Sequence, residues 1–125
     1  MGEKYLIDTN VVIDLSEGKF AGTALDFVAP IIDNAPIISV INKIELLAFS
    51  YVPNEIKEFI ETATVLSFSD EIVEKTIDIR KEFKTKLPDA IIAATALANN
   101  FTIITRNTKD FARIPNLKLI DPYKI

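Results

Sequence analysis

The stretch Tyr5-Leu-Ile-Asp-Thr-Asn-Val-Val-Ile13 decides how the rest of the sequence is interpreted, because an apolar run ends in an acid and passes at once into helix-forming residues. We expect a short buried strand over residues 4–8 and a helix over residues 11–17 that Gly18 ends. Four later segments are equally short and rich in apolar or β-branched residues, at residues 36–40, 64–68, 102–105 and 117–120. Because helical segments separate them, the sequence predicts a parallel sheet covered by helices on both faces, a three-layer α/β/α fold.

The helical segments between these strands have recognisable starting and ending residues. We expect helices over residues 22–33, 42–50, 53–63, 69–84, 88–99 and 108–113. Pro30 predicts a kink or a split in the first of them. The helix from residue 69 should bury a stripe of Ile72, Thr76, Ile79 and Phe83. The sequence has 125 residues, the length of one ordinary domain, so we expect a single domain over residues 1–125.

The amino-acid composition excludes several classes of chemistry. The sequence contains no Cys and no His, which removes disulfides, thiol nucleophiles, imidazole bases and cysteine or histidine zinc sites. A hydrolase of this composition is expected to rely on carboxylates and a hard cation with oxygen ligands. The net charge of −4 argues weakly against a large nucleic-acid surface.

The hydropathy pattern bears on location and on partners. No apolar run is long enough to span a bilayer, and the strand pattern begins so early that we expect no signal peptide. These features predict a cytoplasmic protein with no membrane segment. The mean hydropathy of +0.24 is high for a soluble monomer, and it suggests an apolar patch that covers a partner or a second copy.

Four acids stand where chemistry is expected. Asp8 follows the first strand, and Asp89 follows Pro88 at the start of an almost wholly apolar helix. Ligands of open α/β sheets bind beyond the carboxyl ends of the strands, where Asp8 would project. Structural alternatives exist for both residues, since Asp8 could cap the following helix and Asp89 could favour its own helix dipole.

The other two acids also have alternative interpretations. Glu45 has Ile41, Ala48 and Phe49 as its helical neighbours, which places the carboxylate on an apolar stripe where an unpaired charge is costly. Two structural interpretations of Glu45 remain: its side chain could reach solvent at the edge of the stripe, or it could pair with a distant base. Asp110 follows Asn107 by three residues and resembles a capping box. A cluster of four carboxylates would repel unless a cation neutralised it or some of the acids stayed protonated. Metal binding is the simpler hypothesis.

At these residues the sequence resembles the PIN-domain family, and within it the toxins of VapBC toxin–antitoxin pairs. The resemblance covers essentially the whole chain. It rests on the opening stretch, on Glu45, on Leu87-Pro-Asp-Ala-Ile-Ile-Ala-Ala-Thr-Ala-Leu-Ala98 and on Thr102-Ile-Ile-Thr-Arg-Asn-Thr-Lys-Asp-Phe111. It implies a five-stranded parallel sheet with strand order 3-2-1-4-5, a Mg²⁺- or Mn²⁺-dependent endoribonuclease that uses a metal-activated water, an RNA substrate, a small antitoxin partner and usually a homodimer.

The resemblance also implies roles for individual residues. Asp8, Glu45 and Asp89 are expected as catalytic metal ligands. The fourth acid is Asp110 or stands at the position of Asn107, and we favour Asp110. Expected hydrogen-bonding support comes from Asn10, Thr105 and Asn107, and expected RNA phosphate contacts are Lys84, Lys86 and Arg106.

Three other interpretations compete with this one. An aspartyl-phosphate phosphatase also places its nucleophile after an apolar strand, but it usually carries a second Asp two residues later, where this sequence has Asn10. The second is a catalytically inactive PIN-like scaffold that only binds RNA or protein. The third is a PIN nuclease of RNA processing.

Overall fold

The strand β1 (Tyr5–Ile7) occupies the middle of a five-stranded parallel sheet in the computed structural model, which describes residues 3–125. The sheet order is β3-β2-β1-β4-β5, as the sequence resemblance implied. The remaining strands are β2 (Ile37–Ser39), β3 (Thr64–Leu66), β4 (Thr102–Ile104) and β5 (Lys118–Ile120). Because all neighbouring pairs are parallel, every strand delivers its carboxyl end to the same edge of the sheet.

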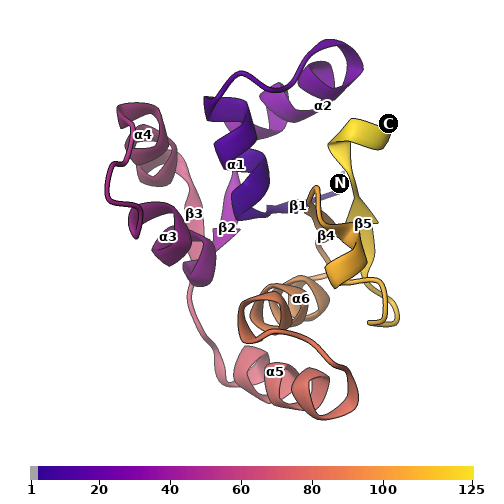
Figure 1. Cartoon of the computed structure of the whole chain (residues 1–125). Coiled ribbons are helices and arrows are strands. Elements are labelled where there is room, and N and C mark those ends of the chain that lie inside the picture. Colours follow the sequence, from indigo (N-terminus) through magenta and orange to yellow (C-terminus); the bar gives the residue numbers. More distant parts are fainter. Residues whose placement is uncertain (1–2) are drawn as a thin grey trace.

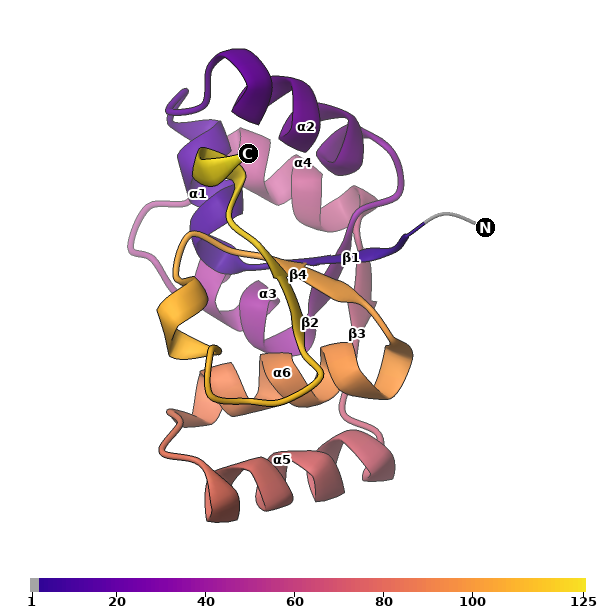
Figure 2. The same ribbon diagram turned by 90° about the vertical axis from the view of Figure 1, so that its right-hand side faces the viewer.

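Helices cover both faces of this sheet (Figures 1 and 2). One face carries α1 (Thr9–Ser16), α2 (Gly22–Asp33) and α4 (Asn54–Thr62), with α3 (Val40–Leu47) beside α4. The other face carries α6 (Leu87–Asn99), and α5 (Asp70–Glu82) packs outside it. This arrangement confirms the predicted three-layer α/β/α fold.

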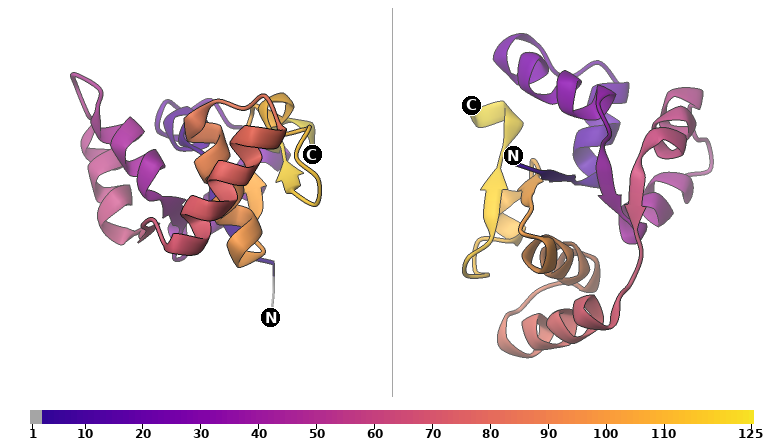
Figure 3. Two further views of the ribbon diagram at one scale, coloured as in Figure 1. Left: turned by 90° about the horizontal axis from the view of Figure 1, so that it is seen from below. Right: turned by 180° about the vertical axis from the view of Figure 1, so that it is seen from behind.

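Each face of the sheet has its own hydrophobic core, because neighbouring residues of a strand point to opposite sides. Leu6 and Ile103 pack toward α6, whereas Ile7 and Ile104 pack toward α1 and α4. Residues 90–96 of α6 are all buried, as expected for a helix between the sheet and α5 (Figure 3). The amino end of α6, whose first turn holds Asp89, lies at the edge of the sheet toward which the strands point (Figure 2).

Several predicted boundaries differ from the structure. Helix α2 runs unbroken through Pro30, so of the predicted kink or split the split is wrong; proline removes only one amide donor from the helix. The predicted helix over residues 108–113 is a 3-10 turn, η1 (Thr108–Asp110). A second 3-10 turn, η2 (Pro122–Lys124), was not predicted. Among residues 3–125, no helix has the length and apolarity that a bilayer crossing requires.

Candidate active site

Asp8 lies directly after β1, at the carboxyl edge of the sheet, and is only 6% exposed. Its Oδ1 accepts a hydrogen bond from the Thr9 backbone N–H at 2.9 Å, so Asp8 does cap α1, as one sequence interpretation expected. Its Oδ2 accepts bonds from Thr105 Oγ1 at 2.8 Å and Asn10 Nδ2 at 3.2 Å. The helix cap therefore occupies one oxygen, and a second set of donors orients the other.

The surroundings of Asp8 shift its pKa in opposing directions. Burial raises the pKa of the Asp8 carboxyl, while the hydrogen bonds from Thr105, Thr9 and Asn10 lower it. The nearby charge of Glu45 raises it further, and the net direction is upward. Hydrogen-bond donors thus surround the Asp8 carboxylate, but no positively charged side chain of the described residues pairs with it. Its negative charge is therefore not neutralised.

The turn after β4 supplies the hydrogen-bonding support that the sequence predicted. Thr105 is fully buried, and the register that pairs Ile7 with Ile104 puts it beside Asp8. Thr105 Oγ1 accepts bonds from Asn10 Nδ2 at 3.2 Å and from the Asn107 backbone N–H at 3.0 Å while it donates to Asp8. The position of Asn107 thus acts through its backbone, and its side chain makes no capping bond to η1.

Glu45 lies near Asp8, but its surroundings differ from those that the sequence predicted. Helix α3 ends at Leu47, so the predicted apolar stripe around Glu45 is wrong, and Phe49 beyond the helix is 53% exposed. The Glu45 side chain is half-buried, and its Oε1 accepts a hydrogen bond of 2.7 Å from Thr9 Oγ1. A hydroxyl on the residue next to Asp8 therefore orients Glu45.

Asn42 joins these two acids and was missed by the sequence analysis. It is fully buried in the first turn of α3, where its Oδ1 accepts the Ser39 backbone N–H in a capping box. Its Nδ2 donates to Thr9 Oγ1 at 3.0 Å and lies 3.4 Å from Asp8 Oδ1. The available signal was an amide three residues before Glu45 and three residues after the capping residue Ser39.

Asp89 is the third residue of α6, behind Pro88 in the first turn. Burial, and then the charges of Asp110, Asp8 and Glu45, raise its pKa to about 6, although Lys86 acts in the opposite direction. The charges of the other three predicted acids therefore contribute to the electrostatic environment of Asp89. The carboxyl edge of the sheet therefore carries a concentration of negative charge.

The four acids are neighbours without forming a closed ligand set. Asp110 is exposed on η1, three residues after Asn107. Within residues 3–125, no three acidic side chains converge closely enough to hold a metal ion. The oxygens of Asp8 and Glu45 already accept hydrogen bonds from Thr105 and Thr9.

The donor chemistry nevertheless suits a hard divalent cation. Every candidate ligand is an oxygen, which Mg²⁺ and Mn²⁺ prefer. In the part of the chain that the structure describes, every ion pair involves Asp14 or Glu17, so no Lys or Arg forms an ion pair with any of the four acids.

The predicted RNA contacts lie in different settings. Lys84 and Lys86 are exposed just before α6. Arg106 is already engaged, because its NH1 donates to Asp14 Oδ1 at 3.0 Å and Oδ2 at 2.8 Å. Asp14 is 2% exposed and was not singled out from the sequence.

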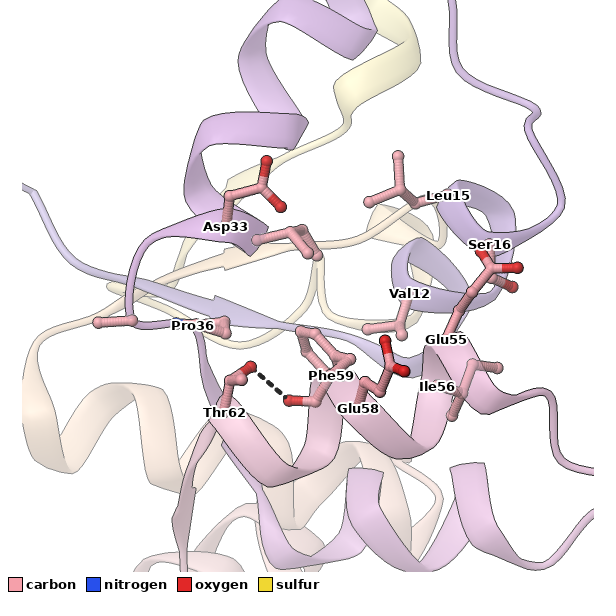
Figure 4. Close-up of a pocket in the computed structure, with 12 residues that line it drawn as sticks. Val12, Leu15, Ser16, Asp33, Pro36, Glu55, Ile56, Glu58, Phe59 and Thr62 are labelled. Carbon is pink, nitrogen blue, oxygen red and sulfur yellow. Dashed lines mark hydrogen bonds between the residues drawn. The ribbon is translucent and has the colours of Figure 1, made fainter.

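A pocket of about 350 Å³ lies apart from the four acids, between α1, α2 and α4 (Figure 4). Its floor is apolar, with Val12 and Phe59 among the lining residues, and its charged lining residues are Asp33, Glu55 and Glu58. A hollow of this composition favours an apolar ligand surface that also carries positive charge.

Comparisons with known proteins agree with this architecture. The sequence profile of the PIN domain matches residues 5–117. The chain is 33% identical over 129 residues to the Ribonuclease VapC of Rickettsia bellii, across 92% of this chain and 93% of that protein. A toxin–antitoxin complex from Klebsiella pneumoniae contains a chain with a TM-score of 0.77 and 34% identity, covering 98% of this chain and 100% of that one. The Rickettsia felis VapBC2 complex, bound to a DNA fragment from its promoter, contains one with a TM-score of 0.75 and 25% identity, covering 93% and 96%.

Proposed function

The chain belongs to the PIN-domain family, and on that premise we propose that it is a Mg²⁺- or Mn²⁺-dependent endoribonuclease, the toxin of a VapBC-type pair, which acts in the cytoplasm. The observation that carries the proposal is the hydrogen-bond network at the carboxyl edge of the sheet, in which Thr9 and Asn42 link the buried Asp8 to Glu45 and Thr105 orients Asp8. Identity of 33% to a named Ribonuclease VapC over nearly the whole chain supports the same activity.

The residues of the site have separable tasks in this proposal. Asp8, Glu45, Asp89 and Asp110 hold the cation, and Thr105, Thr9 and Asn10 orient two of those carboxylates. When bound, the cation lowers the pKa of a water and screens the phosphodiester. Because the pKa of Asp89 is about 6 before metal binding, this carboxyl must lose a proton to bind the cation below about pH 6 and is already mostly ionised at neutral pH.

Cleavage of RNA by the pure protein tests the proposal. Cellular RNA is incubated with the protein in millimolar Mg²⁺ or Mn²⁺, with and without chelator, and separated on a denaturing gel. We expect discrete fragments that require the cation. Asp8→Asn should keep the circular dichroism spectrum and lose the fragments, because the amide cannot supply a charged ligand. Asp26→Asn, an exposed acid on α2, is the matched control and should cleave normally. Full activity of Asp8→Asn would contradict the assignment.

The antitoxin is expected to bind as a basic amphipathic segment. The pocket between α1, α2 and α4 supports this, since an apolar floor and three acids, Asp33, Glu55 and Glu58, complement such a segment. Expression of the chain alone should slow growth, and co-expression of the partner should restore it. Glu55→Lys with Glu58→Lys should weaken the rescue without changing RNA cleavage. Rescue that is as strong as with the unmodified chain would exclude this pocket.

A homodimer is also part of the proposal. Four large apolar side chains on α3 and the loop after it are exposed, and they offer an apolar surface for a second copy: Ile44 (55%), Leu47 (42%), Phe49 (53%) and Tyr51 (77%). Analytical ultracentrifugation should detect a dimer that Phe49→Asp weakens. A monomer at all concentrations would contradict it.

A further inference from the structure

Asp14 is the most deeply buried acid of the described chain, and the proposed metal site does not use it. Its side chain lies on the buried side of α1 and contacts partners from three separate segments. Arg106 NH1 donates to both of its oxygens, Tyr123 OH donates to Oδ2 at 2.8 Å, and Lys19 Nζ lies 3.9 Å from Oδ1. Burying a carboxylate is costly unless its partners compensate for the lost water, so these contacts hold η2 and the turn after β4 against α1.

Asp14 lies one helical turn beyond Asn10, on the same face of α1. Both side chains bind the same turn after β4. Asn10 Oδ1 accepts the Arg106 backbone N–H at 3.0 Å, and Asp14 accepts the Arg106 guanidinium. Arg106 is therefore fixed at its backbone and at the end of its side chain.

The Asn10 bond continues into the proposed active site. The same Asn10 amide that accepts from Arg106 donates through Nδ2 to Asp8 Oδ2 and Thr105 Oγ1, both at 3.2 Å. Thr105, which precedes Arg106, donates to the same Asp8 oxygen at 2.8 Å. A displacement of Arg106 would thus change both donors that orient Asp8 Oδ2.

We infer that Asp14 is a positioning residue for the metal site, acting through Arg106 and Asn10 on the orientation of Asp8, with Tyr123 as its support from η2. Tyr123 stacks on Phe20 with ring centroids 4.8 Å apart, which fixes its hydroxyl beside Asp14. The inference rests on the proposed function, since it assigns Asp14 and Tyr123 to the same site. It also gives Arg106 a role other than the predicted RNA phosphate contact, because the Arg106 guanidinium donates to Asp14.

Mn²⁺ affinity measured without RNA tests this inference. Asp14→Asn keeps the shape of the side chain and removes its charge, while Tyr123→Phe keeps the ring stack and removes one donor. Groups that orient a metal ligand change metal affinity by about 10- to 100-fold. We expect Asp14→Asn to raise the Mn²⁺ dissociation constant by about tenfold, the lower end of that range, and Tyr123→Phe to raise it less. In RNA cleavage, kcat should fall while KM changes little.

Ile79→Val is the matched control, because Ile79 is buried on α5 across the sheet from Asp14. It should lower the melting temperature and leave the Mn²⁺ dissociation constant unchanged. Unchanged Mn²⁺ affinity in both Asp14→Asn and Tyr123→Phe would overturn the inference and leave Asp14 a purely structural residue. If Asp14→Asn does not fold, Tyr123→Phe alone decides, by the same criterion.

Failure of the proposed function is distinguishable from failure of this inference. A wild-type protein that neither binds Mn²⁺ nor cleaves RNA would contradict the function. Hydrogen exchange of the Arg106 backbone N–H, measured by NMR, then still tests the link. Faster exchange in Asp14→Asn than in Ile79→Val is expected, and equal exchange would overturn the link.

Discussion

Replacing Asp89 with asparagine should stabilise the metal-free protein at about pH 7.5, even though Asp89 is a proposed metal ligand. Burial, and then the charges of Asp110, Asp8 and Glu45, raise the pKa of Asp89 to about 6. The ionised carboxylate is therefore less favourable in the folded than in the unfolded chain, where the pKa is about 3.9. Because the side chain is half-exposed, solvent screening limits the penalty, and we expect asparagine to add about 1 kcal/mol to the free energy of unfolding.

The sign of this effect fixes its pH dependence. The folded-state pKa is the higher one, so the contribution of the neutral carboxyl is complete below about pH 4 and is lost as the pH rises through about 6. Asparagine stays neutral at every pH. The gain from Asp89→Asn should thus grow as the pH rises from about 4 to about 6 and be complete above about pH 6.

Urea unfolding with excess chelator, followed by circular dichroism between about pH 4 and pH 7.5, measures the gain. Asp26→Asn, an exposed acid, serves as the control for a general loss of negative charge. Saturating Mn²⁺ should then reverse the order, because a cation at 100 times its dissociation constant stabilises the wild type by about 2.7 kcal/mol, and the variant has lost a ligand. A variant that is less stable than the wild type at pH 7.5 in chelator would refute the reasoning.

Three further outcomes are expected. Mn²⁺ at millimolar concentration should raise the melting temperature of the wild type, measured by differential scanning fluorimetry, because only the folded chain gathers the acids; no shift would count against the metal site. Phe111→Ala should cost about 3–5 kcal/mol in urea unfolding, since Phe111 is 0% exposed in the core beside α6, and a loss below about 1 kcal/mol would contradict that packing. Lys84→Glu with Lys86→Glu should weaken binding of an RNA oligonucleotide in chelator and lower its salt dependence, whereas Lys57→Glu on α4 should not; equal effects would indicate a general change in charge.

The sequence predicted the parts of the site that strand ends position. Asp8 and Thr105 each follow a strand, and the carboxyl ends of parallel strands share an edge, so their proximity could be inferred without coordinates. Asp89 was predictable because a wholly apolar helix had to be central and its first turn had to lie at one edge of the sheet. In each case a single element fixed the residue's position.

Residues whose role depends on distant partners were not predictable in the same way. Asp14 has an unremarkable position on a short helix, and its partners Arg106 and Tyr123 are 92 and 109 residues away. The Glu45 prediction reached the right neighbourhood on a wrong premise, because the helix ended before the residues that were expected to surround it. Where the helix ended depended on tertiary packing that periodicity does not report.

The parallel sheet also governs when the protein can become active during its synthesis. The central strand β1 leaves the ribosome first, but one of its two neighbours is β4, and the hydroxyl that orients Asp8 belongs to a residue made 97 positions later. At about 5–20 residues per second, roughly 5–20 s of translation separate the two. A nascent chain therefore cannot form the hydrogen bond that orients Asp8 Oδ2 until Thr105 has left the ribosome and β4 has paired with β1.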